Sequence, residues 1–398
     1  MRILKQIIQK NLEWFKSSGV MFPADGSWGV AERIAVRSGN TAMERILTVF
    51  PAFTEFDGGC VIEPRRADCN FQTAWIFLMA GRLFPGNGYE LIGKNIIDFL
   101  YCRSGLLERG TEEGCVPGSW NWSHITRTRA IWYDDESWCV LLQRKIAEAF
   151  PELDKKYQMR YWSDILAKNL YEALAAPEPS PLWSGNRAMP HFSAPGIMAL
   201  AEAAAEENKV EYQTLAEKFY ANPECPNSSE HAYALIGAVN CARKFGKEKF
   251  LEYACRHADA IIAKIDPESG IMPSEHHEAP QGKAVADMIY TLNWSLIGMR
   301  ELALLKEKPY RTVAEQLINF VCKIQDNTPS PRFNGCWRGM YDIVQQSWGG
   351  GDCHEGGANS IYTGWTNAPV CSALLLEYAK KSMFEAIPYN GGSTEHCR

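Results

Sequence analysis

Two adjacent aspartates, Asp134 and Asp135, stand among aromatic residues in the segment WYDDESW at positions 132–138. Cleavage of a glycosidic bond needs a proton donor for the leaving oxygen and usually a second carboxylate as base or nucleophile. Successive residues of a helix point about 100° apart. We therefore expect one aspartate to do the chemistry and the other to support it. Burial beside Trp132 and Trp138 would raise the pKa of one carboxyl toward that of a general acid. The helix N-terminus would oppose this rise, because it stabilises the ionised form. The alternative is that an aspartate here only caps the helix.

A second polar group lies in the segment EPRRAD at positions 63–68. Arg65 and Arg66 directly precede an apolar stretch, and two arginines could hold the carboxylate of a uronic acid through paired hydrogen bonds. The competing interpretation is that they neutralise nearby acids. Asp68 is a candidate second catalytic acid, with helix capping as its alternative.

The third group is the glycine-rich segment WGGGDCHEGG, which begins at Trp348. Each ordered glycine costs backbone entropy, so such a run predicts a loop that folds closely over a ligand. We expect His354 to contact that ligand. A metal bound by Asp352, His354 and Glu355 is conceivable, but their spacing is a weak signal. We expect no metal and no cofactor.

The composition narrows the class of protein. The chain has 398 residues, of which 46% are hydrophobic and 22% charged, and its formal net charge is -6. No polybasic stripe is present, so we expect no nucleic-acid partner. Charges interrupt every long apolar run, including the N-terminal one, so neither a membrane span nor a signal sequence is indicated. The 13 cysteines form no C-x-x-C pair and are expected to be reduced thiols of a cytoplasmic protein.

The elements that must position these residues are helices. Six stretches are apolar nearly all round, which is typical of helices surrounded by protein: 70–84, 136–147, 194–205, 230–242, 284–304 and 367–379. Six others are amphipathic and alternate with them: 3–16, 90–102, 161–175, 211–220, 249–265 and 310–324. No alternating strand pattern competes. The pattern predicts an all-α fold, an (α/α)6 toroid of six helical hairpins in a single domain over 1–398, with the N-terminal helix packed on the last inner helix.

In such a toroid the starts of the inner helices converge on one mouth, which we expect to hold the site. The residues at these junctions, with the aromatic rings that could stack on sugar faces, add to the binding residues: His191, His231, Tyr290, Tyr362 and Trp365. His276 and His277 lie in a polar segment that we interpret as a solvated loop. His257 is expected to be structural.

The alternating helices, Tyr133-Asp134-Asp135 with Trp138, and the aromatic glycine-rich segment before Trp365 resemble the six-hairpin glycosidase superfamily. The pattern is similar in kind to unsaturated glucuronyl and rhamnogalacturonyl hydrolases and to bacterial alpha-mannanases. The resemblance implies a glycoside hydrolase that acts on oligosaccharides, and the paired arginines favour a uronic-acid substrate.

Two alternatives stay open. A sugar epimerase or isomerase on a similar toroid would use histidines of the cleft as acid and base. A carbohydrate-binding protein would bind an oligosaccharide without changing it. The sugar, the linkage, the stereochemical outcome and the oligomeric state are not specified by the sequence.

Overall fold

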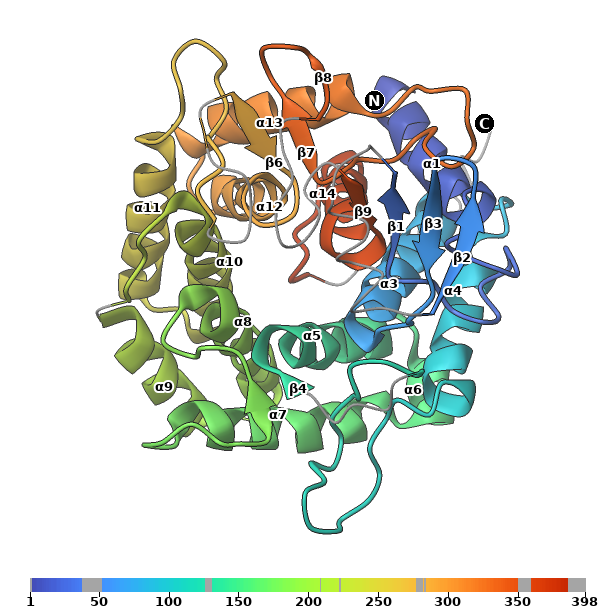
Figure 1. The fold of residues 1–398 in the computed structure, drawn as a ribbon. Helices are drawn as coiled ribbons and strands as arrows, with labels where there is room; N and C mark the ends of the chain where they lie inside the picture. The colour runs from blue at the N-terminus through green and yellow to red at the C-terminus, as the bar shows by residue number, and fades with distance from the viewer. Residues whose placement is uncertain are drawn as a thin grey trace, which may run out of the picture.

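Helices form most of the molecule in the computed structural model, which describes residues 2–37, 52–125, 131–207, 209–221, 223–276, 282, 284–349 and 359–385. They are arranged as two concentric rings around one axis (Figure 1). None of the helices in these ranges is both long and apolar enough to cross a bilayer. The predicted all-α toroid is confirmed.

The inner ring is closed. Within the described residues it consists of α3 (Ala67–Leu83), α5 (Tyr133–Ala149), α8 (Pro190–Glu207), α10 (Ser228–Phe245), α12 (Leu292–Ala303) and α14 (Ala368–Ala379). Each of these helices packs against the next, and α14 packs against α3. Because protein surrounds them on all sides, they can be apolar around their whole circumference, as the sequence predicted.

The outer ring covers the inner one, helix by helix. Its members are α1 (Arg2–Ser17), α4 (Tyr89–Asp98), α7 (Met159–Ala175), α9 (Val210–Ala221), α11 (Glu248–Ile262) and α13 (Tyr310–Ile324), and a short helix, α6 (Pro151–Tyr157), leads into α7. Each outer helix buries one face against its partner and turns its charged face outward. The N-terminal helix α1 packs on α14, as predicted.

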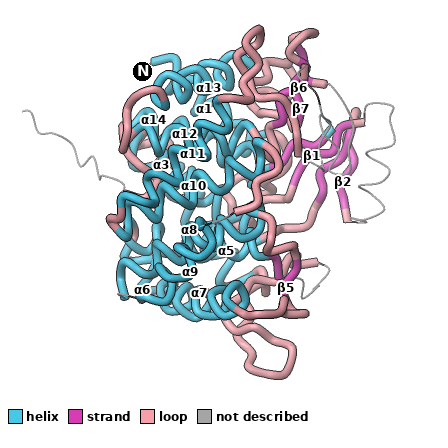
Figure 2. The backbone as a smooth tube through the Cα atoms, turned by 90° about the vertical axis from the view of Figure 1, so that its left-hand side faces the viewer, coloured by secondary structure: helices cyan, strands magenta, loops and turns pink. Residues whose placement is uncertain are grey.

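The few strands of the structure leave no alternating pattern in the sequence. Short strands gather with the longer loops on one face of the toroid (Figure 2): β1 (Arg33–Val36), β2 (Phe53–Phe56), β3 (Gly59–Ile62), β4 (Ile131–Trp132), β5 (Trp183–Ser184), β6 (Val285–Asp287), β7 (Met340–Asp342), β8 (Ser347–Trp348) and β9 (Ser360–Tyr362). They have two to four residues each, too few to display an alternating pattern. The stretch after Ala284, predicted to be helical, begins with β6 and a turn, and α12 starts only at Leu292.

One of these sheets, at the mouth of the toroid, pairs strands that are far apart in the sequence. Its order is β2-β3-β1-β9, and all pairs are antiparallel. Arg33 of β1 pairs with Tyr362 of β9, and Ala35 pairs with Ser360. The sheet therefore brings residues 32–33 next to the segment that leads into α14.

A candidate active site at the mouth of the toroid

A cavity of about 250 Å³ opens where the inner helices begin. Acidic, basic and aromatic side chains from well-separated parts of the sequence line it together: Glu32, Arg33, Arg66, Trp122, Trp132, Asp134, Asp135, His191, Phe192, Ile289, Tyr290, Tyr362 and Trp365. The predicted convergence of inner-helix starts on one hollow is therefore present. Eight of the predicted site residues lie in its wall: Arg66, Trp132, Asp134, Asp135, His191, Tyr290, Tyr362 and Trp365.

Asp134 and Asp135 occupy the first turn of α5 and both face this cavity. The N-cap of α5 is Trp132, and no side chain caps the helix, so capping does not account for the pair. Asp135 Oδ1 accepts a hydrogen bond from Arg66 Nη2 at 2.6 Å. Asp134 Oδ2 lies 3.4 Å from His191 Nε2, and its buried Oδ1 has no hydrogen-bond partner among the described residues. The two neighbours thus sit in different electrostatic surroundings.

Arg66 is shared by three carboxyl groups. Its Nη1 donates to Glu32 Oε1 at 3.0 Å, and its Nε and Nη2 each donate to an Asp68 oxygen at 3.2 Å, besides the bond to Asp135. Glu32 also accepts from Arg33 Nε at 3.1 Å. Two guanidinium groups therefore face three carboxyl groups, an arrangement that favours keeping a proton on one of them.

The protonation of Asp135 follows from this crowding. Burial raises the pKa of Asp135 well above its usual range, the carboxyl groups of Asp68, Asp134 and Glu136 add to the rise, and Arg66 opposes it. Burial also raises the pKa of Asp68 against the influence of Arg66. The cluster can thus hold a transferable proton to higher pH than an exposed carboxyl would.

Asp68 lies directly behind the cavity wall, not in it. The carboxyl is 1% exposed and accepts hydrogen bonds from Arg66 and, at 2.9 Å, from Trp365 Nε1. Trp365 belongs to a π-helical turn, η3 (Thr363–Asn367), which packs so closely on α3 that a Cβ on Gly364 would meet Cys69 Cα at 2.4 Å. Asp68 therefore fixes the orientation of Arg66 and Trp365.

A buried histidine of the cavity wall, His191, contacts a second buried histidine behind it, His276. His191 Nδ1 lies 3.0 Å from His276 Nε2, and Glu230 Oε2 accepts the backbone N–H of His191 at 2.6 Å. The ring of His191 is stacked between Phe192 and Tyr233, at centroid distances of 4.5 and 4.7 Å.

His276 is stacked in turn on Tyr290 at 3.9 Å and is fully buried. The interpretation of this segment as a solvated loop is therefore wrong for His276, because its polar sequence neighbours conceal its burial. His277 lies outside the described residues.

Four other predicted binding residues are not placed in the cavity wall. Arg65 turns away and donates from Nε to the carbonyl of Trp28 at 3.1 Å and from Nη1 to Glu63. Trp138 lies deeper and stacks on Trp294 at 5.2 Å. His231 contacts His257 between α10 and α11. His354, with Asp352 and Glu355, lies outside the described residues.

These departures have a common physical reason. A helix junction can be placed from the sequence, but the direction of each side chain depends on local backbone geometry. His231 immediately follows the buried Glu230, and that single step along α10 turns it to a different side of the helix. The same reason applies to Arg65, because a side chain one position before Arg66 points in a different direction.

Sequence reasoning missed Glu32, Arg33 and Trp122. None of the three lies at the start of an inner helix, where the sequence predicts the site residues. Arg33 lies over the ring of Tyr362 at 4.1 Å, and Arg66 lies 5.3 Å from the ring of Trp122. Only the pairing of β1 with β9 brings Arg33 to the mouth.

The chain has the fold of the six-hairpin glycosidases, an (α/α)6 toroid found in several classes of carbohydrate-active enzyme. Comparison of the sequence with protein-family models and with curated proteins gives no match.

Solved structures with this fold cover nearly the whole chain. A D-mannose isomerase aligns with a TM-score of 0.61 and 13% identity, over 94% of this chain and 97% of that chain. An unsaturated glucuronyl hydrolase specific for heparin gives 0.61 and 12%, over 96% and 99%. An inactive variant of the alpha-1,6-mannanase of Salegentibacter sp. HEL1_6, with two consecutive aspartates replaced by alanine and alpha-1,6-mannotetrose bound, gives 0.55 and 11%, over 94% and 99%. At such identities the likeness shows the fold alone.

Proposed function

We propose that this protein is a glycoside hydrolase that cleaves an oligosaccharide in the cavity at the mouth of the toroid. One observation carries the proposal: two consecutive carboxyl groups, Asp134 and Asp135, face the same small cavity in different surroundings. Hydrolysis of a glycosidic bond requires such a division between a protonated and an ionised carboxyl.

The surroundings assign the two roles. Asp135 is assigned the role of acid, since burial and the neighbouring acids raise its pKa against the influence of Arg66, and its proton would pass to the leaving oxygen. Asp134 lines the same cavity beside His191, and its Oδ1 has no hydrogen-bond partner among the described residues, so we assign it the role of base or nucleophile. The inactive mannanase variant, which lacks two consecutive aspartates and binds its oligosaccharide, supports a catalytic role for such a pair.

The cavity volume and lining favour the end of a short sugar chain. About 250 Å³ lies just below the roughly 300–1,000 Å³ typical of small-molecule sites. Trp132, Phe192 and Trp365 offer ring faces to the apolar side of a sugar, and the charged groups offer partners for its hydroxyls.

The charge of the wall bears on the uronic-acid hypothesis. Among the described lining residues, Arg33 and Arg66 face three carboxyl groups, and Arg65 is directed elsewhere. Arg66 is already engaged by carboxylates, so the paired-arginine grip expected from the sequence does not form. We therefore propose a neutral sugar at the cleavage site and place uronyl substrates second.

A substrate screen with matched variants tests the proposal. Neutral and uronyl oligosaccharides are incubated with the wild-type protein, and released sugar is measured. Replacement of an essential acid typically costs about 10²–10⁴ in rate, so Asp135→Asn and Asp134→Asn should each reduce release by that factor. The exposed Asp25→Asn should behave like the wild type. Equal activity in all four proteins would contradict the assignment.

The histidine pair favours a second candidate, a sugar isomerase or epimerase. His191 lines the cavity and lies in hydrogen-bonding contact with His276 behind it, and such a pair could remove and return a proton at a sugar carbon. This activity would release no sugar, would incorporate solvent deuterium and would be lost in His276→Gln. Unchanged oligosaccharide with measurable affinity would instead identify a binding protein.

A further inference from the structure

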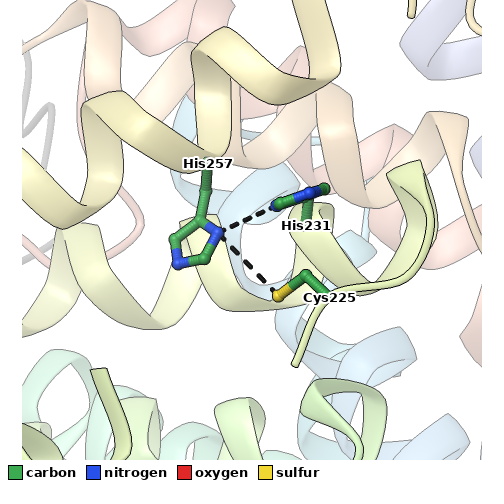
Figure 3. Close-up of side chains that lie close together, drawn as sticks. All are labelled: Cys225, His231 and His257. Carbon is green, nitrogen blue, oxygen red and sulfur yellow. Dashed lines mark hydrogen bonds between the residues drawn. The ribbon is translucent and has the colours of Figure 1, made fainter. Parts of the chain in front are cut away.

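A second cluster of reactive side chains lies between the inner helix α10 and the outer helix α11, and none of its members lines the cavity. Cys225, in the connection between α9 and α10, meets His231 of α10 and His257 of α11 (Figure 3). His231 Nδ1 lies 3.0 Å from His257 Nδ1, and Cys225 Sγ lies 3.9 Å from the same nitrogen. The three potential ligand atoms all fall within 4.8 Å of one another.

These separations fit one metal ion at the centre. Zinc binds imidazole nitrogen at about 2.0–2.1 Å and thiolate sulfur at about 2.3 Å, with tetrahedral geometry. Those lengths place two nitrogens about 3.3 Å apart and a sulfur about 3.6 Å from a nitrogen. The nitrogen pair is a few tenths of an ångström closer than this, the sulfur is a few tenths farther from His257 Nδ1, and the Cys225 sulfur lies within 4.8 Å of a His231 nitrogen, so side-chain adjustment would complete the site.

We propose that Cys225, His231 and His257 bind a zinc ion. A thiolate with two imidazoles is a donor set that suits zinc and selects against the oxygen-preferring magnesium and calcium. His257 is buried, whereas Cys225 and His231 are half-buried, so an ion can enter from solvent and a water molecule can occupy the fourth position.

The protonation of the three groups is compatible with metal binding. Burial lowers the pKa of His257 to about 3 and also lowers that of His231, so both rings are neutral at pH 7 and offer lone pairs. Burial raises the pKa of the Cys225 thiol to about 12, with Glu230 adding to the rise and Arg256 opposing it. Zinc must therefore displace the thiol proton, which makes binding depend on pH.

The ion would serve as a clamp between elements. It would tie the α9–α10 connection to the start of α10 and to the middle of α11, and so fasten two neighbouring hairpins. None of the three residues lines the cavity, so the site is independent of the proposed hydrolysis.

Metal titration of the full-length protein tests the site. The protein is stripped with a chelator and titrated with zinc by calorimetry and with cobalt by absorption spectroscopy. We expect one equivalent of either metal, a thiolate-to-cobalt charge-transfer band, release of about one proton and a higher Tm with zinc.

Variants locate the binding. Replacement of a residue that only supports a ligand costs about 10–100-fold in affinity, so loss of a ligand should cost at least about 100-fold. Cys225→Ser should lose the charge-transfer band and this affinity, and His231→Gln should lose the same affinity. The exposed Cys102→Ser should titrate like the wild type. Binding without the band, binding unchanged in Cys225→Ser, or no stoichiometric binding by the wild type would each overturn the proposal.

Discussion

At the scale of single residues, Arg66 determines how charge is distributed in the cavity wall. It contacts Glu32, Asp68 and Asp135 at once, and so holds together three carboxyl groups that would otherwise repel one another. The same guanidinium lowers the pKa of Asp135, which burial raises. The pH range over which Asp135 remains an acid therefore depends on Arg66.

Replacing Arg66 should move the alkaline limit of activity. In Arg66→Gln the cation that lowers the pKa of Asp135 is gone, so the carboxyl keeps its proton to higher pH. The alkaline limb of the kcat/KM profile should shift upward by about 1 unit or more, whatever the loss in maximal rate. Arg66→Lys retains the charge and should shift the limb less. A limb that stays in place or moves to lower pH would contradict the role of Asp135 as acid.

A histidine behind the site should make stability depend on pH. His124 Nδ1 accepts the backbone N–H of Arg65 at 3.0 Å, and burial, with the charge of Arg65, lowers the pKa of His124 to about 4. His124 therefore binds a proton more weakly in the folded state than in the unfolded state, where its pKa is near 6.5. This contribution is complete above the unfolded value and is lost as the pH falls from there toward 4.

Urea unfolding at pH 7 and pH 5 checks this sign. Between pH 7 and pH 5, the free energy of unfolding of the wild type should fall by about 1 kcal/mol more than that of His124→Gln, after allowance for solvent screening. Glutamine can still accept the Arg65 N–H but does not titrate. Equal losses in both proteins would contradict the prediction.

At the scale of elements, the helices could be predicted and the connections could not. All twelve predicted helical stretches contain a helix, because a buried or half-buried helix leaves a periodic pattern over ten or more residues. Asp134, Asp135 and His191 could be predicted as site residues because they lie at the starts of those helices. Strands of two to four residues leave no such pattern, and the pairing of β1 with β9 joins residues more than 300 positions apart. Arg33 and Glu32 were missed for that reason.

The π-helical turn before α14 should tolerate no side chain at Gly364. A Cβ there would meet the backbone of Cys69 at 2.4 Å, so Gly364→Ala must push η3 away from α3. Such overpacking typically costs about 1–3 kcal/mol, and it would also loosen the Trp365–Asp68 hydrogen bond. The Tm of thermal unfolding and the rate of sugar release should both fall. Gly349→Ala, whose added Cβ would meet nothing within 4 Å among the described residues, is the matched control and should change neither.

At the scale of the whole molecule, α1 closes the outer ring against α14. Its inward face carries fully buried Leu12, Trp14 and Phe15, which belong to the same continuous core as the residues of the inner ring. Asn11 adds a polar link, since its Nδ2 donates to Asn367 Oδ1 at 3.0 Å. We therefore propose that the toroid unfolds as one cooperative unit.

A pair of substitutions in α1 tests this cooperativity. Leu12→Ala should lower the free energy of unfolding by about 2–5 kcal/mol, as large-to-small changes in a core do. Ile3→Ala, at a position 72% exposed in the same helix, should stay within about 0.5 kcal/mol of the wild type. Tryptophan fluorescence and far-UV circular dichroism should shift together in Leu12→Ala. Two separated transitions would show that α1 and the ring unfold independently.

The pairing of β1 with β9 affects the order in which the protein can mature. During translation, Arg33 leaves the ribosome more than 300 residues before its strand partner Tyr362. Until then, the edge of β1 that receives β9 presents unpaired backbone groups, and no nascent chain contains a finished cavity. The cavity that the proposed function needs therefore forms only after β9 has been synthesised, and a product terminated before β9 lacks both this strand and Trp365.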